Sequence, residues 1–154
     1  MKIGGILENT DLALYRIGTL DDTPGAAGAI LKFFAQRNIN LEYITESGSM
    51  EGPASISICL KDEFVAEVDR FIHENKERIK NYNIHKIEEV STISIYGPHF
   101  REKHSIAARF CSLLGANGVN ILGLSSSVSS ICAVIQTVQL ENARKAVLKK
   151  FELP

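Results

Sequence analysis

The sequence contains no tryptophan, and only three of its 154 residues are cysteine. Three cysteines without close spacing do not build a disulfide framework, so we expect reduced thiols. No apolar run reaches the ~18 residues that span a bilayer, and the first residues do not resemble a signal peptide. Lys and Arg total 17 against 18 Asp and Glu, which leaves no excess of positive charge for nucleic acid. These absences predict a cytoplasmic globular protein that binds neither membrane nor nucleic acid.

Motifs for catalysis, metal binding and nucleotide binding are also missing from the sequence. The four histidines are scattered and form no H-E-x-x-H pair, and the cysteines lack the C-x-x-C spacing of zinc sites. No glycine-rich phosphate loop of the G-x-x-x-x-G-K-[ST] or G-x-G-x-x-G type is present. We therefore expect no enzyme activity, no cofactor and no metal ion.

The sequence does contain an internal repeat. Ile30–Ser47 and Phe110–Ser127 align over 18 residues without a gap, at an offset of 80 residues. Few residues are identical, but hydrophobic and polar positions agree along most of the alignment. The best match places Asn40 and Asn120 each between two aliphatic residues. A repeat of this length indicates a duplicated structural unit.

The first half of the chain reads as a βαββαβ unit. Ala27, Ile30, Leu31 and Phe34 have the i, i+3, i+4, i+7 spacing of a buried helical face, and Pro24 suits the first turn of that helix. Period-two alternation and turn residues mark the strands. The predicted strands are residues 12–17, 39–45, 55–60 and 83–90, and the second helix covers residues 64–72. This order predicts an α+β fold of the ferredoxin-like type.

The second half repeats this order, but the chain ends at Pro154 before a last strand. Its predicted strands are residues 93–95, 119–124 and 131–138, and its helices are residues 107–114 and 140–151. A missing strand would leave backbone groups unpaired beside an apolar face. We predict that residues 2–7, which have no place in the first unit, complete the second sheet and interlock the domains. The first domain would then be residues 8–90, and the second residues 91–154 plus 1–7; the alternative is a frayed N-terminal tail.

The start of the first predicted helix suits a free amino acid, which needs partners for a carboxylate and an ammonium group. Backbone N–H groups at Gly25, Ala26 and Ala27 would face a carboxylate at the positive end of the helix dipole. Gly25 lacks a Cβ and would let a ligand approach the backbone. Asp22 could accept a hydrogen bond from the ammonium group. Glu42 and Glu46 could bind a cationic side chain, which favours lysine.

Several segments in series resemble the regulatory region of aspartokinases, which is a pair of ACT domains. These segments are Lys2–Ile6, Leu12–Leu14, Asp22–Gly25, Ile39–Ile44, Ile121–Ser127 and Ile131–Val134. The resemblance covers essentially the whole chain and implies a non-catalytic homodimer that binds lysine or threonine at the interface between ACT domains. In that family a kinase catalytic domain lies upstream. This chain begins at Met1, so we expect a stand-alone regulatory protein that could act on a separate enzyme subunit.

The resemblance also implies which residues contact the amino acid. In the first half these are Asp22, Gly25, Ala26, Ala27, Asn40, Leu41 and Glu46; in the second half they are Asn120, Ile121, Ser125 and Ser127. The second half departs from the family pattern at two places. His104-Ser105 stands where the first half has Pro24-Gly25, and Val128 replaces an acidic residue after the serine run. Both departures weaken the prediction of a ligand site belonging to the second half.

Each candidate residue also has a structural interpretation. Asp22 and Thr23 could cap a helix, and the two asparagines could bond backbone groups where a strand begins. Ser125–Ser127 could be a loop at the end of a strand. The alternative function is therefore a structural dimerisation module, or regulatory subunit, that binds no ligand.

Overall fold

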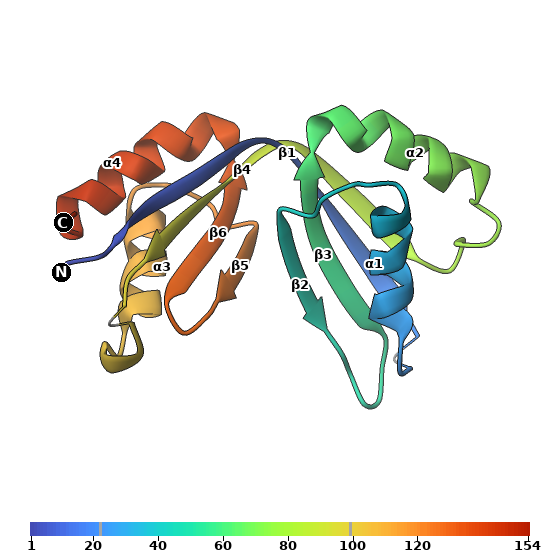
Figure 1. Ribbon diagram of the computed structural model, residues 1–154, viewed down its shortest axis with the longest axis horizontal. Helices are drawn as coiled ribbons and strands as arrows, with labels where there is room; N and C mark the ends of the chain where they lie inside the picture. The colour runs from blue at the N-terminus through green and yellow to red at the C-terminus, as the bar shows by residue number, and fades with distance from the viewer. Residues whose placement is uncertain (22, 99) are drawn as a thin grey trace. The chain divides into compact units, whose positions relative to one another are not determined.

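A computed structural model of the chain describes residues 1–21, 23–98 and 100–154. The chain forms two compact units, which are residues 11–88 and residues 1–10 together with 89–154. Two long strands, β1 (Gly5–Leu20) and β4 (Asn83–Tyr96), contribute to both units (Figure 1). Each strand joins two segments that the sequence predicts as separate strands, and a residue with positive φ lies within each: Asp11 in β1 and Glu89 in β4.

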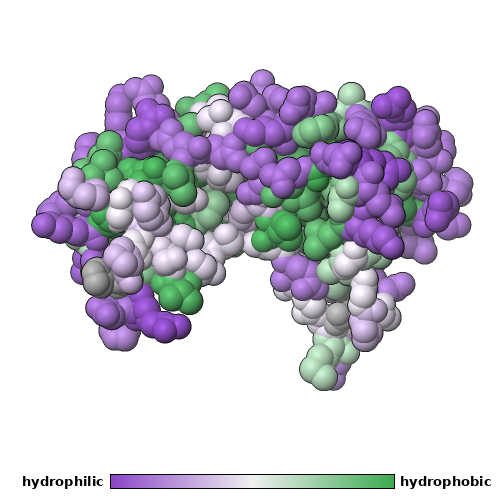
Figure 2. Space-filling view, in the orientation of Figure 1, coloured by the Kyte–Doolittle hydropathy of each residue, from purple (hydrophilic) through white to green (hydrophobic). Residues whose placement is uncertain are grey.

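The unit of residues 11–88 is a sheet with the strand order β2–β3–β1–β4 and two helices. Its further elements are α1 (Ala26–Gln36), β2 (Tyr43–Ser47), β3 (Ala54–Lys61), a 3-10 turn η1 (Asp62–Phe64) and α2 (Val65–Glu74). β3 pairs antiparallel with β1 and β2. Alternate residues Ala13, Tyr15, Ile56, Ile58 and Leu60 share one core with Phe34 of α1 and with Val65 and Val68 of α2. On the face shown in Figure 2, α2 is mainly hydrophilic, because its apolar side packs on the sheet.

The second unit has the same plan, with the strand order β1–β4–β6–β5. Its further elements are η2 (Phe100–Glu102), α3 (Ile106–Ala116), β5 (Gly123–Ser126), β6 (Ser130–Gln136), η3 (Thr137–Gln139) and α4 (Leu140–Lys150). Its core gathers apolar residues of β4, β6 and both helices, among them Ile93, Phe110 and Val147. The two helices pack against each other.

The N-terminal segment belongs to the core of this second unit and is not frayed. Ile3 is 4% exposed and packs in that core. Its N–H donates to the carbonyl oxygen of Glu152 at 2.9 Å, and the Gly4 N–H donates to the carbonyl oxygen of Tyr96. The predicted fold, with two ferredoxin-like units and an N-terminal strand that completes the second sheet, is confirmed.

The repeat predicted from the sequence is visible in the helices. α1 and α3 each contain 11 residues and begin 80 positions apart. Both end in a Schellman motif, in which Asn38 and Gly118 have positive φ angles of 56° and 73°. The N–H groups of Ile39 and Val119 then donate back to Phe34 and Leu114, both at 3.0 Å.

This motif also explains where the predicted strand boundaries were wrong. Residues 39–45 and 119–124 were expected to be strands, but β2 begins at Tyr43 and β5 at Gly123. The Schellman turn inserts Ile39 and Val119 into the cores, where they are 4% and 3% exposed. Their backbone therefore closes the preceding helix, and regular pairing with β3 and β6 starts only afterwards.

Candidate functional site

The start of α1 leaves backbone donors open to a ligand. Gly25 is the N-cap residue, with φ 90° and ψ −4°, and no side chain caps the helix. The Ala26 N–H donates to the Thr23 carbonyl oxygen at 3.2 Å, and the Gly25 carbonyl oxygen accepts the first helical bond from Ala29 at 3.0 Å. Within the described part of the chain, the N–H groups of Ala27 and Gly28 donate to no acceptor. Such groups, at the positive end of a helix dipole, suit a carboxylate.

The predicted ligand contacts at the start of α1 are only partly among the described residues. Asp22, predicted to bind the ammonium group or to cap the helix, lies outside the described residues. The alternative that Thr23 caps α1 with its side chain is wrong, because Gly25 is the N-cap and the helix has no side-chain cap. A Cβ built on Gly25 would meet nothing within 4 Å. Glycine is therefore favoured here by the left-handed backbone and not by close packing of neighbouring atoms.

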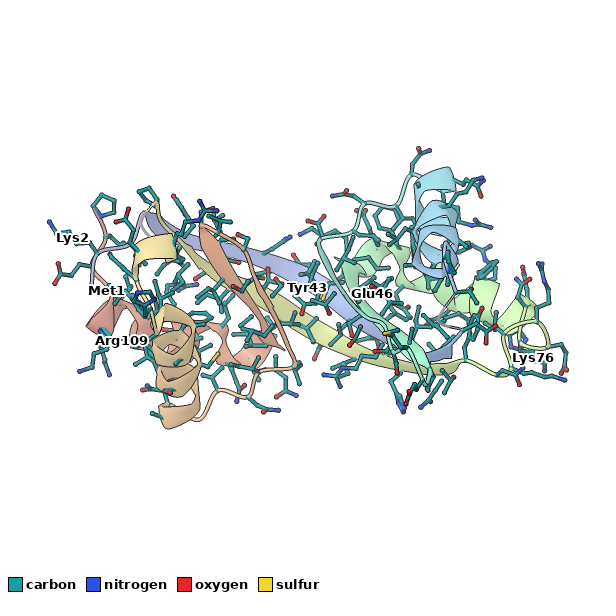
Figure 3. All side chains as sticks on the ribbon, turned by 90° about the horizontal axis from the view of Figure 1, so that it is seen from below. Met1, Lys2, Tyr43, Glu46, Lys76 and Arg109 are labelled. Carbon is teal, nitrogen blue, oxygen red and sulfur yellow. The ribbon has the colours of Figure 1, made fainter. Side chains whose placement is uncertain are left out.

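The other ligand contacts predicted in the first half, Asn40, Leu41 and Glu46, lie away from the start of α1 in the same unit. Asn40 and Leu41 follow the C-terminal end of α1, so the whole helix, about 16 Å long at 1.5 Å per residue, separates them from Gly25 (Figure 1). The Asn40 side chain donates to the Glu42 carboxylate at 3.3 Å. This bond differs from the structural interpretation of Asn40, which predicted a bond to a backbone group at the start of a strand. Glu46 is exposed on β2, opposite Ile56 of β3 (Figure 3).

In the second half, the predicted residues have mixed surroundings. Asn120 is exposed, and its N–H donates to the Gln139 side chain at 3.2 Å. Ile121 packs against the core, and Ser125 pairs with Cys132 in the sheet. The Ser127 hydroxyl bonds the Ser130 hydroxyl at 2.9 Å and accepts the Ser130 N–H at 3.2 Å. Ser127 thus stabilises the turn between β5 and β6, as its structural interpretation predicts.

Helix α3 begins with the same geometry as α1 but without glycine. Ser105 occupies the N-cap position with φ 78° and ψ 3°, and its carbonyl oxygen accepts the Arg109 N–H at 2.9 Å. The sequence departure at His104-Ser105 has therefore kept the left-handed turn. The left-handed N-cap residue that begins α1 therefore has a counterpart at the start of α3 in the second unit.

Three polar side chains that the sequence did not connect interact in the unit of residues 11–88: Tyr15 is buried, whereas Asp69 and Lys86 reach the surface. The Tyr15 hydroxyl donates to Asp69 Oδ1 at 2.8 Å, and Lys86 forms an ion pair with Asp69 Oδ2. Burial, followed by the bond to Asp69, raises the pKa of Tyr15 well above its usual range. The bond to Asp69 raises the pKa of Lys86. Tyr15 and Asp69 are 54 positions apart, so no local pattern could have paired them.

The described residues contain no cluster of three or more His, Cys, Asp or Glu side chains that could hold a metal ion. Among the described residues, Cys59, Cys111 and Cys132 form no disulfide. Among the described helices, none has the length and apolar character needed to cross a membrane.

Comparison with protein families matches residues 93–151 to the ACT domain. The chain is 26% identical over 151 residues to an aspartate kinase of Pseudomonas fluorescens, which covers 98% of the chain and 37% of that kinase. It is 21% identical over 153 residues to an aspartokinase of a Bacillus species, again over 37% of the relative's length. The chain thus spans little more than a third of the relatives that it matches.

Solved structures show the same fold. The regulatory subunit of aspartate kinase from Thermus thermophilus has a TM-score of 0.84 at 20% identity, over 99% of this chain and 100% of that one. An aspartate kinase from Synechocystis has a TM-score of 0.85 at 20% identity, over 96% of this chain and 26% of that one. The 154 residues therefore share their fold with a regulatory subunit of aspartate kinase along nearly the whole chain.

Proposed function

We propose that this chain, which corresponds to the ACT-domain regulatory region of aspartokinases, binds a small amino acid such as lysine or threonine. The observation that carries the proposal is the start of α1, where Ala27 and Gly28 present N–H groups with no acceptor among the described residues. The ligand's carboxylate accepts these two bonds. Its role is regulatory, a proposal supported by the fold shared with the regulatory subunit of aspartate kinase from Thermus thermophilus.

The remaining contacts come from the other predicted residues. Asp22 accepts a bond from the ligand's ammonium group. Glu46 binds a cationic side chain, which favours lysine. Because Asn40 and Leu41 lie at the far end of α1 from Gly25, one unit does not offer both groups to one small ligand. We infer that the second set is supplied by another copy of the chain in a homodimer, and that Asn120, Ile121 and Ser125 serve in the same way.

The proposed mechanism is allosteric. A ligand that binds one arrangement of the dimer more tightly shifts the population towards that arrangement by its differential affinity. The change is transmitted to a separate enzyme subunit in the cytoplasm. Regulatory subunits of aspartate kinase among the structural neighbours support the proposal that regulation and catalysis lie on separate subunits.

The alternative, a dimerisation module without ligand, has one observation in its favour. The hydroxyl of Ser127 is already bonded within its own turn, so this predicted ligand contact is occupied by the fold. If the alternative holds, no amino acid will bind at the start of α1.

The test is thermal unfolding of the full chain with each of the twenty amino acids. A ligand at 100 times its Kd adds about 2.7 kcal/mol to the free energy of unfolding, which raises the Tm measurably. Ala27→Pro removes one of the proposed donors at a position in the first helical turn, where proline is tolerated. We expect this variant to lose the Tm shift caused by the ligand.

Ala107→Pro is the matched control, since Ala107 holds the same position in α3. It should also be destabilised but should keep the shift, because Ser105 carries a Cβ where Gly25 leaves the helix start open to a ligand. A shift that survives in Ala27→Pro, or no shift with any amino acid, contradicts the proposal.

A further inference from the structure

The unit of residues 11–88 contains a cavity between its two helices and its sheet. The cavity has a volume of about 450 Å³, and every lining residue falls between Tyr15 and Ile84. Most of its wall is apolar, and several wall residues, such as Ile30, Phe33 and Ile72, are only half-buried although they pack against the core. Protein cores normally leave few voids larger than a water molecule. An apolar hollow of this size lies within the range of volumes that small-molecule sites have.

The second unit shows how the same position looks when it is filled. Ala26 and Ile30 of α1 line the cavity, and their equivalents 80 positions later are Ile106 and Phe110. Phe110 is completely buried, and Ile106 is 6% exposed. Larger side chains thus occupy in α3 the position that α1 leaves open.

Aromatic residues close one side of the cavity. The rings of Phe33 and Phe71 lie 4.0 Å apart between their centroids, so the two helices meet through these side chains. The Arg37 guanidinium covers the Phe33 ring at 3.9 Å. This contact is a cation–π interaction at the C-terminal end of α1.

In the part of the chain that the structure describes, the rim carries one charged group of each sign. Asp21 and Thr23 line it from the segment before α1, and Arg78 lines it from the segment after α2. Both charged side chains belong to exposed residues. Among the described residues, Arg78 makes one long contact, in which its guanidinium donates to Asn75 Oδ1 at 3.5 Å. Most of its guanidinium donors therefore remain available for a carboxylate.

We propose that this cavity is a second binding site, specific for an α-amino acid with a large apolar side chain. The side chain enters the cavity, the carboxylate binds Arg78, and the ammonium group binds Asp21. A hollow of about 150 Å³ already accepts benzene. The cavity of about 450 Å³ is therefore large enough for the aromatic ring of an amino acid whose ammonium and carboxylate groups stay at the rim. The site goes beyond the proposed function, because it uses the interior between α1 and α2 and not the N–H groups of Ala27 and Gly28.

The experiment follows isoleucine methyl groups by NMR while L-phenylalanine is added to the full chain. Five isoleucines line the cavity: Ile17, Ile30, Ile72, Ile79 and Ile84. Ile93, Ile95 and Ile131 belong to the other core and are the internal control. We expect the methyl signals of the first group to shift saturably and those of the control group to stay in place.

Two analogues test the charges on the rim. 3-Phenylpropionate lacks the ammonium group, and phenethylamine lacks the carboxylate. Both should bind at least tenfold more weakly than phenylalanine, because each leaves Asp21 or Arg78 without its partner. The proposal is overturned if phenylalanine leaves the cavity methyl groups unmoved, or if phenethylamine binds as tightly as phenylalanine.

Two variants locate the site. Arg78→Gln should weaken phenylalanine binding at least tenfold. Lys76→Gln, in the same segment (Figure 3) but outside the cavity wall, should leave it unchanged. Ile30→Phe introduces the residue of α3 and should abolish binding by filling the hollow. Equal binding by all three variants overturns the proposal.

The two sites can be tested separately. Ala27→Pro should abolish the response to lysine or threonine and keep the response to phenylalanine, whereas Arg78→Gln should do the reverse. If no amino acid acts at α1 but phenylalanine shifts the cavity methyl groups, only the proposed function fails. If lysine or threonine acts and phenylalanine does not, only the second site fails.

Discussion

Gly25 and Ser105 adopt the same left-handed backbone conformation at the starts of α1 and α3, with φ angles of 90° and 78°. The two residues are 80 positions apart, which is the offset of the internal repeat. In both helices the carbonyl oxygen of this residue accepts the first helical bond. The turn before the helix is therefore a shared feature of the duplicated unit, and glycine is present in only one copy.

Gly25→Ala should lower the free energy of unfolding by about 1 kcal/mol, because a side chain in the left-handed region clashes with its own backbone. Gly28→Ala is the matched control in the same helix. Gly28 has ordinary helical geometry, and a Cβ there would meet nothing within 4 Å. Alanine should therefore raise the free energy of unfolding by about 0.5–1 kcal/mol. Urea unfolding measures both, and changes of the same sign would contradict this account.

Ser105→Gly should stabilise the chain by about 0.5–1 kcal/mol, since glycine adopts the left-handed conformation without a clash. The Ser105 side chain does not cap α3, so no hydrogen bond is lost. Urea unfolding of this variant beside the parent chain checks the prediction. A loss of stability would show that the serine side chain contributes more than its backbone strain costs.

Ile3→Ala should lower the free energy of unfolding by about 2–5 kcal/mol, because it removes a buried side chain and leaves a cavity. Ile3 is 4% exposed within the second core. Leu7→Ala is the control, since Leu7 is 61% exposed and its loss should change the free energy by no more than about 0.5 kcal/mol. Equal effects in a denaturant titration would mean that the N-terminal segment does not hold the second unit together.

Stability should fall as the pH rises above 10. The pKa of Tyr15 is raised in the folded chain, so the unfolded chain releases this proton first, from about pH 10 upwards. Lys86, whose pKa is also raised, acts in the same direction. Loss of one extra proton on unfolding lowers the free energy by at most about 1.4 kcal/mol per pH unit.

Tyr15→Phe should make this decline less steep, because the buried phenol no longer contributes. The free energy of unfolding, measured by urea titration between pH 8 and 11, tests the slope. Tyr82→Phe, at an exposed tyrosine, is the control. Parallel curves for Tyr15→Phe and the parent chain would contradict the assigned role of Tyr15.

Much of the architecture could be predicted from local patterns. The spacing of Ala27, Ile30, Leu31 and Phe34 indicated α1 because residues three and four apart share one helical face. The repeat and the series of short segments indicated two ACT-type units. The need to fill the last place in the second sheet indicated the role of residues 2–7. Each of these inferences depends on neighbouring residues or on the number of strands in a known unit.

The arrangement of the candidate site residues could not be predicted from such local patterns. Gly25 and Asn40 are close in sequence, yet a full helix lies between them in the folded unit. Ser127 belongs to a promising serine run, but its hydroxyl stabilises a turn. The strands expected at Ile39 and Val119 begin later, because hydrogen bonds back to the helices place these residues in the cores.

Patterns along the chain therefore predicted the helices and the repeat, since these depend on the order of residues a few positions apart. The pairing of Tyr15 with Asp69, and the hollow between α1 and α2, emerged only when distant segments packed together. Packing of that kind depends on the shapes and volumes of side chains that come into contact in the folded chain. The sequence around Ala26 or Ile30 does not show which side chains lie opposite these two residues.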